Sequence, residues 1–122
     1  MIAVGVGASR GCPVDELEDL VADALREAGV THGAVRALAS AEIKASEPAL
    51  IALARGHRWP LRFFTAARLA AVPVPTPSAV VAGHVGTPSV AEAAALLAAG
   101  SRAELLVEKR RSAHATCAVA RS

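Results

Sequence analysis

The chain opens with a short apolar strand, a glycine-containing loop and an amphipathic helix, and no other feature constrains the fold as strongly. Residues 2–6 form an apolar, β-branched run, which predicts a buried strand. The loop 7–11 follows, and apolar residues then recur at helical spacing from Pro13 to Ala28 before Gly29, a typical helix stop. A strand that passes through a glycine loop into a helix is the start of an α/β unit.

The rest of the chain continues the alternation of strands and helices and then ends in two successive strands. Further strands are predicted at 33–40, 61–64, 104–108 and 115–120, and further helices at 47–55, 66–71 and 90–99. Ser46 and Thr65 are expected to cap the first two of these helices, and Gly56 to end the first. Residues 109–114 are short enough for a hairpin connection, whereas the prolines within 72–78 indicate an extended surface segment.

The predicted fold class is therefore α/β, with a mixed, mostly parallel sheet flanked by helices and an antiparallel hairpin at the C-terminus. A chain of 122 residues has the size of one domain, so residues 1–122 are expected to form a single unit.

Composition excludes several classes of partner. One Trp, two Phe and no Tyr are too few for base stacking, and a net charge of +2 is too small for DNA binding, so no nucleic acid is expected. Prolines and glycines interrupt the long uncharged run that begins at Leu69, so no membrane-spanning helix is expected. No basic segment precedes the first strand, which indicates no signal peptide, and two cysteines make no disulfide framework. The expected location is the cytoplasm.

Several segments in a fixed order resemble one known family. They are Val-Gly-Val-Gly-Ala-Ser-Arg-Gly at 4–11, Lys-x-x-Glu at 44–47, Pro-Thr-Pro-Ser at 75–78, Val-Gly-Thr-Pro-Ser-Val-Ala-Glu-Ala at 85–93, Lys109, and Thr-x-Ala-Val-Ala at 116–120. Together they resemble the CobE family, whose domain is also the C-terminal domain of the cobalt-precorrin-5A hydrolase CbiG. The resemblance covers essentially the whole chain, and the segment 85–93 is its most specific part.

This resemblance implies a place in cobalamin biosynthesis. CbiG-type enzymes open the lactone ring of cobalt-precorrin-5A and release a two-carbon unit as acetaldehyde, whereas the stand-alone CobE form belongs to the aerobic pathway. The expected ligand is an anionic precorrin or corrinoid intermediate, and other enzymes of the pathway are candidate partners. No cofactor is expected apart from cobalt carried by the substrate. Position 8 is alanine where the family more often has cysteine, which excludes a mechanism that uses a thiol there.

The glycine loop is the first candidate part of a binding site. Backbone N–H groups at a strand-to-helix junction attract anions, and the acetate and propionate groups of a corrinoid precursor are suitable anions. Gly7, Ser9 and Arg10 are the candidate residues, and Arg10 could grip a carboxylate through two hydrogen bonds. The alternative is an ordinary tight turn. Nucleotide binding is disfavoured, because Arg10 breaks the Gly-x-Gly-x-x-Gly pattern and no Gly-Lys-Ser/Thr follows.

The only two lysines of this arginine-rich chain, Lys44 and Lys109, are further candidates. Lys44 could bind a substrate carboxylate, and Glu47 could activate water for lactone opening. The alternative for Lys44 and Glu47 is a charge pair at a helix start. The resemblance adds Lys109 and Thr116 to the binding residues, where the basic run alone indicates a solvated turn.

The segment before the alanine-rich helix is a second candidate for anion binding. Ser89 and Glu92 match a Ser-x-x-Glu capping box, which already explains both residues structurally. Gly86, Thr87 and Ser89 would offer donors at the helix N-terminus, and the resemblance includes Glu92. His84 is a second candidate for the general base, with an exposed loop histidine as the alternative.

The other histidines, cysteines and aromatic residues have structural interpretations. His32 and His57 lie beside glycines and are predicted to be surface residues, whereas Cys117 belongs to an apolar strand. Cys12 near a helix N-terminus could have a lowered pKa, although a structural role is preferred. The spacing of histidines and cysteines predicts no metal site. The aromatic residues are expected in the core; they are Trp59, Phe63 and Phe64.

These observations lead to one hypothesis with two competitors. The chain is expected to bind an anionic tetrapyrrole in a cleft near one edge of the sheet. If the chain is catalytic, Glu47 or His84 activates water, and Lys44 or Lys109 stabilises the oxyanion or the leaving carboxylate. The competitors are a non-catalytic carrier of the same intermediate and a generic anion- or nucleotide-binding regulatory domain.

Overall fold

The computed structural model describes residues 1–74 and 89–122, and it places five strands of these residues in one mixed sheet of order β3-β2-β1-β5-β4. The strands are β1 (Ile2–Ala8), β2 (Val35–Ala41), β3 (Leu61–Phe64), β4 (Glu104–Arg111) and β5 (Ala115–Arg121). The first three strands pair in parallel, whereas β5 runs antiparallel to both β1 and β4. The predicted α/β class, with helices flanking a mixed sheet and a C-terminal hairpin, is confirmed.

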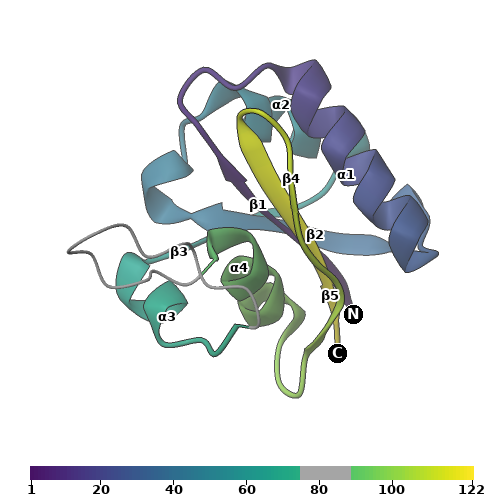
Figure 1. Ribbon diagram of the computed structural model, residues 1–122, viewed down its shortest axis with the longest axis vertical. Coiled ribbons are helices and arrows are strands. Elements are labelled where there is room, and N and C mark those ends of the chain that lie inside the picture. Colours follow the sequence, from purple (N-terminus) through teal and green to yellow (C-terminus); the bar gives the residue numbers. More distant parts are fainter. Residues whose placement is uncertain (75–88) are drawn as a thin grey trace.

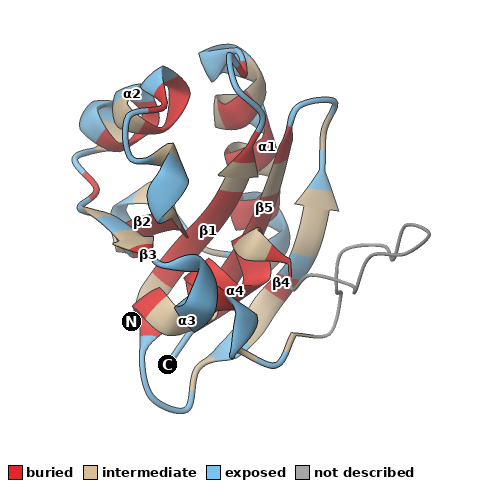
Figure 2. Ribbon diagram, turned by 90° about the vertical axis from the view of Figure 1, so that its left-hand side faces the viewer, coloured by how far each residue is buried: buried red, intermediate tan, exposed pale blue. Residues whose placement is uncertain are grey.

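Helices cover both faces of the sheet (Figures 1 and 2). Helices α1 (Val14–Ala28) and α2 (Pro48–His57) lie on one face, and α3 (Ala66–Ala70) and α4 (Val90–Ala99) lie on the other. Two short 3₁₀ helices, η1 (His32–Ala34) and η2 (Glu42–Lys44), precede β2 and α2. No helix in the described parts of the chain is long and apolar enough to cross a membrane.

The two faces of the sheet are packed with side chains of different size. Leucines and valines of α1 and the sheet fill the first face, together with the buried ring of Trp59. On the second face α4 presents mainly alanines. The helix therefore lies so close to β1 that a Cβ on Gly5 would stand 1.9 Å from the carbonyl oxygen of Ala91 and 2.6 Å from the nitrogen of Ala95. The close approach of the helix backbone requires glycine at position 5.

Most predicted helix ends are confirmed, but those of α2 are not. Gly29 ends α1 in the left-handed conformation, and the Thr65 side chain caps α3. Glu47, rather than Ser46, occupies the N-cap position of α2. Helix α2 also continues through Gly56 to His57, and the C-cap residue Arg58 adopts the left-handed conformation at φ 59°. The chain turns there because the N–H of the buried Trp59 bonds back to the carbonyl of Ala54 at 2.9 Å.

The predicted basic connection 109–114 is only half correct. Strand β4 extends through Arg111, so Lys109 and the two residues after it belong to the strand, and only 112–114 form the turn. Arg110 pairs with Cys117 across the hairpin, and its guanidinium contacts Glu27 of α1. Of the three basic residues 109–111, Arg110 thus has an acidic partner on α1. Most of the predicted extended segment 72–78 lies outside the described residues.

Candidate functional site

The carboxyl ends of β1, β2 and β3 meet at one edge of the sheet, where ligands bind in open α/β folds. Three cavities lie along this edge. The hairpin cavity, about 290 Å³, lies between the end of β1 and the β4–β5 turn. The α2 cavity, about 540 Å³, lies between the loop after β1 and the start of α2. The apolar cavity, about 340 Å³, lies between η2 and α3 and includes Val90 of α4.

The carboxylate of Glu47 organises the α2 cavity. Its side chain is 8% exposed, and Oε1 accepts a hydrogen bond of 3.0 Å from the backbone N–H of Gly11. Gly11 has a left-handed backbone, with φ at 76°, and this conformation turns its N–H toward α2. This hydrogen bond joins the loop after β1 to the start of α2. Glu47 therefore fixes the relative position of the two segments that line the α2 cavity.

Backbone N–H groups of the loop after β1 are bound within the chain, and one of them binds a carboxylate. The N–H of Gly11 binds Glu47, the N–H of Ser9 donates to the carbonyl of His114 at 2.8 Å, and the N–H of Cys12 donates to Ser9 at 3.0 Å. The N–H groups of Ser9 and Gly11 belong to the loop that was predicted to face a ligand, and both already have partners within the chain. The exposed side chains of Ser9 and Arg10 remain directed to solvent.

Two cations line the α2 cavity. Arg10 and Lys44 both border it, together with Ser46 and Ile43. Within 1–74 and 89–122, neither Arg10 nor Lys44 is within ion-pair distance of a carboxylate. The structure thus brings together Arg10, Lys44 and Glu47, as the sequence analysis expected. An anionic group that enters this cavity would meet positive charge without having to displace an internal partner.

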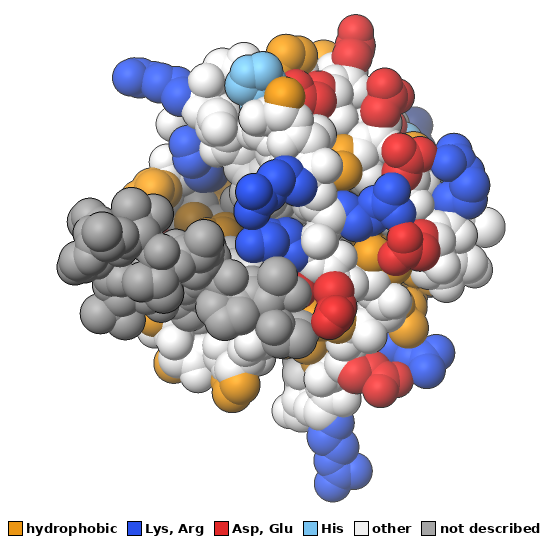
Figure 3. All heavy atoms as spheres, viewed as in Figure 1, with side chains coloured by type: hydrophobic (Ala, Val, Ile, Leu, Met, Phe, Trp, Pro, Cys, Tyr) orange, Lys and Arg blue, Asp and Glu red, His pale blue; other side chains and the backbone are white. Residues whose placement is uncertain are grey.

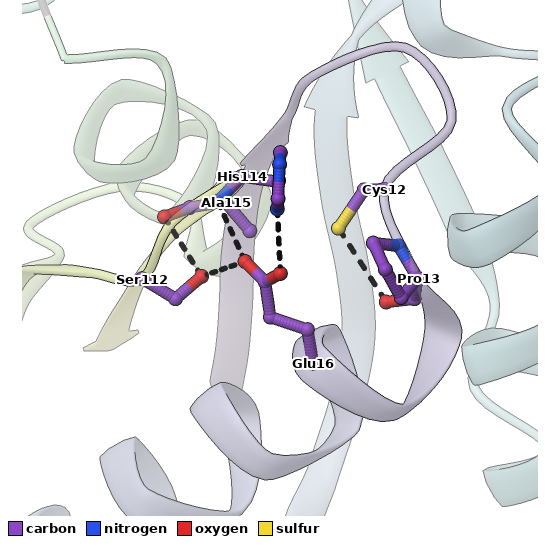
Figure 4. A network of polar contacts seen from close by, with 6 residues as sticks. All are labelled: Cys12, Pro13, Glu16, Ser112, His114 and Ala115. Atoms are coloured by element: carbon purple, nitrogen blue, oxygen red, sulfur yellow. Dashed lines mark hydrogen bonds and ion pairs between the residues drawn. The ribbon is translucent and has the colours of Figure 1, made fainter.

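The hairpin cavity is built on a network around Glu16 of α1 (Figure 4). Its carboxylate accepts hydrogen bonds from the Ser112 hydroxyl, from the backbone N–H of His114 at 2.6 Å and from the His114 ring at 2.8 Å. Thr116 also lines this cavity, and its Oγ1 would be 2.8 Å from a Cβ on Gly7. The predicted residues Gly7, Ser9 and Thr116 therefore share one cavity.

Hydrogen bonds from Ser112, and then from His114, lower the pKa of Glu16 from 4.5 to about 2. The carboxylate stays ionised at neutral pH and holds the hairpin turn against the start of α1. The sequence analysis missed Glu16 and Ser112, because their partners lie roughly a hundred positions apart along the chain and no local pattern connects them. The sequence analysis also missed Ile43, which is 86% accessible. The one local sign of it is an apolar residue within a polar linker.

Ser89, Glu92 and Lys109 lie at the junction of α4 and β4. The Ser89 hydroxyl accepts from the N–H of Glu92 at 3.3 Å, which confirms the Ser89 half of the predicted capping box. Glu92 is fully buried, and its Oε2 accepts from the backbone N–H of Lys109 at 2.9 Å. Ser89 and Glu92 thus fix the start of α4 beside the sheet, whereas the half-buried Lys109 is the member of this group with access to solvent.

The remaining predicted site residues fall into two groups. His84, Gly86 and Thr87 lie outside the described residues. Cys12 is buried, and burial, with Glu16 and Glu47 nearby, raises the pKa of its thiol, so the lowered pKa considered from sequence is wrong. Burial likewise raises the pKa of Cys117 to about 12, in agreement with its predicted core position.

Basic side chains are prominent on the face that Figure 3 shows, where several Lys and Arg side chains gather above the β1 and β4 region. A further cavity of about 550 Å³ lies beside the other end of α4, lined by residues such as Arg68 and Arg102, away from the edge described above. The sheet edge is the stronger candidate site, because it combines the cations, the buried carboxylate and the ends of the parallel strands.

Comparison with known proteins assigns the chain to a family. Residues 2–120 match the family model described as Cobalamin synthesis G C-terminus. The chain is 41% identical to Protein CobE of Sinorhizobium sp over 121 residues, which are 98% of this chain and 79% of that protein. It is 30% identical to Cobalt-precorrin-5A hydrolase of Priestia megaterium, covering 98% of this chain but only 32% of that enzyme.

A solved structure supports the same assignment. The crystal structure of CobE, a protein from the cobalamin biosynthetic pathway, superposes with a TM-score of 0.88 at 38% sequence identity, covering 100% of this chain and 90% of that one. Sequence and fold agree over nearly the whole length. The chain therefore belongs to the family of cobalamin-biosynthesis proteins that comprises CobE and the C-terminal domain of CbiG.

Proposed function

We propose that the chain binds an anionic precorrin or corrinoid intermediate of cobalamin biosynthesis along the carboxyl edge of its sheet. The observation that supports this most directly is the junction of two unlike cavities. The α2 cavity carries Arg10 and Lys44, the apolar cavity is lined by Leu69, Ala70 and Val90, and Ile43 borders both.

A tetrapyrrole intermediate matches such a junction chemically. Its macrocycle offers an apolar face, which would pack against Ile43 and the apolar cavity, and its rim carries acetate and propionate groups. One or more of these carboxylates would meet Lys44 and Arg10 through charge-assisted hydrogen bonds. The hairpin cavity, with Thr116 and the solvent-accessible His114, would receive further polar groups of the rim.

Holding the intermediate without chemical change is the form of this function that the geometry favours. The Glu47 carboxylate is buried and already accepts from Gly11, so it is placed to shape the cavity rather than to activate water. Hydrolytic opening of the lactone, with release of acetaldehyde, is the second candidate, with Glu47 or His84 as the base.

A spectroscopic titration tests the proposal. Purified protein is titrated with cobalt-free and cobalt-containing pathway intermediates, while the visible absorption of the ligand is recorded and released acetaldehyde is assayed. A spectral shift without acetaldehyde supports the carrier, and a shift with acetaldehyde supports the hydrolase. No shift with any intermediate would refute binding at this edge.

The Lys44→Ala variant locates the site. Loss of one charge-assisted hydrogen bond should weaken corrinoid binding roughly 10- to 100-fold. The matched control is Arg36→Ala, which also removes one positive charge, but from an exposed residue near the amino end of β2 and far from the carboxyl edge. Equal losses in both variants would show that only net charge matters, and would contradict the assignment of the cavity.

A further inference from the structure

Three potential metal ligands meet outside the candidate cavities. Glu18 of α1, His32 of η1 and His57 of α2 each place one ligand atom within 4.8 Å of the other two. The Nε2 of His57 is in direct contact with Oε1 of Glu18. The side chains are partly accessible, 25% for His57 and 41% for Glu18, so an ion can reach them from solvent. None of the three lines the hairpin, α2 or apolar cavity.

Aromatic stacking holds the two imidazoles in place. The ring of His57 stacks on the buried indole of Trp59 with centroids 4.5 Å apart, and the ring of His32 stacks on His57 at 4.7 Å. The indole N–H of Trp59 also donates to the backbone carbonyl of His32 at 3.0 Å. Trp59 thus contacts both histidines and holds them beside Glu18.

The cluster contains one potential ligand more than the ion pair between His57 and Glu18. A His–Glu ion pair requires two residues, as His114 and Glu16 show elsewhere in this chain. Here a second imidazole stands within the same 4.8 Å, on a third segment of the chain. Two imidazole nitrogens and one carboxylate oxygen form a ligand set typical of Zn²⁺, with the fourth position left to water.

We propose that Glu18, His32 and His57 bind one Zn²⁺ ion, which links α1, η1 and α2 on the face of the sheet opposite α4. The ion replaces the hydrogen bond between the Nε2 of His57 and Glu18, and the neutral imidazole binds it through Nε2 while keeping its one proton on Nδ1. The site is a structural clamp with one accessible position. It is independent of corrinoid binding, because its residues do not line the cavities at the carboxyl edge.

Calorimetric titration of the metal-free protein with ZnCl₂ tests the proposal. One equivalent of Zn²⁺ should bind, the melting temperature should rise, and EDTA should reverse the rise. Trp59 is the only tryptophan of the chain, so a change in its emission during the titration reports binding at the stacked imidazoles.

Two variants and one control make the test specific. His57→Ala should weaken Zn²⁺ binding at least tenfold, and Glu18→Gln should weaken it similarly while leaving the stack on Trp59 intact. His114→Ala, which removes a histidine from a His–Glu pair without a third ligand, should bind Zn²⁺ like the parent. The proposal is overturned if the parent binds no Zn²⁺, or if Glu18→Gln, folded like the parent by circular dichroism, binds it unchanged.

Discussion

Replacing Gly5 by alanine should destabilise the fold more than the same change at any other glycine that the structure describes. The new Cβ would lie 1.9 Å from the carbonyl oxygen of Ala91, 2.6 Å from the nitrogen of Ala95 and 2.9 Å from the Cβ of Ala95. Two of these three atoms are backbone atoms of α4. They cannot rotate away as a side chain can, so the whole helix must move from the sheet.

The size of this destabilisation follows from the usual cost of overpacking a core. Overpacking a core costs about 1–3 kcal/mol, and a clash with helix backbone belongs at the upper end of that range. A loss of about 3 kcal/mol is a large part of the roughly 5–15 kcal/mol by which a domain is stable. For a domain of this size it corresponds to a fall in melting temperature of roughly 10 °C.

The assay is urea unfolding followed by far-ultraviolet circular dichroism, with Gly56→Ala as the matched control. Gly56 lies inside α2 with nothing within 4 Å of an added Cβ, so the same chemical change should stabilise the protein there by about 0.5–1 kcal/mol. The two substitutions therefore have opposite expected signs. The reasoning is refuted if Gly5→Ala is as stable as the parent, or if adding Ala95→Gly restores full stability, because the Ala91 carbonyl clash would remain.

Two further substitutions probe the site. Glu47→Gln keeps an oxygen that can accept from Gly11 and should leave the free energy of unfolding nearly unchanged, whereas Glu47→Ala should cost about 1–3 kcal/mol; equal losses on urea unfolding would contradict the role of this hydrogen bond. Because the pKa of Glu16 is lowered from 4.5 to about 2, its contribution to stability is complete above about pH 4.5 and is lost as pH falls toward 2. Glu16→Gln should remove that part of the pH dependence, and parallel stability curves for the variant and parent between pH 6 and pH 3 would argue against it.

The parts of the fold that could be predicted from sequence are those in which the signal is local. The apolar run of β1 and the periodicity of α1 each lie within one element, and both elements form where the pattern places them. The same local reasoning failed at the end of α2. Gly56 resembles a helix stop, yet Arg58 takes the left-handed position, because the burial of Trp59 determines where the chain must turn.

The candidate site could be predicted only in part, for a related reason. Arg10, Lys44 and Glu47 were named from the glycine loop, the rarity of lysine and the family resemblance, and they do line one cavity. That the loop N–H of Gly11 binds the Glu47 carboxylate could not be predicted, since the two residues lie 36 positions apart. The proximity of Glu18, His32 and His57 could not be predicted either, because their spacing along the chain matches no metal-binding motif.

The two ends of the chain lie next to each other. The terminal ammonium group of Met1 donates to the carbonyl of Ser122 at 3.2 Å, and Ile2 pairs with Arg121 between β1 and β5 (Figure 1). Both ends therefore emerge at the edge of the sheet opposite the cavities. A short peptide bridge could join them into a ring, and new ends could be opened in the exposed turn at Ser101, without altering the path of the chain through the core. The same geometry allows a neighbouring domain to be attached at either end while the candidate site at the opposite edge stays open to solvent.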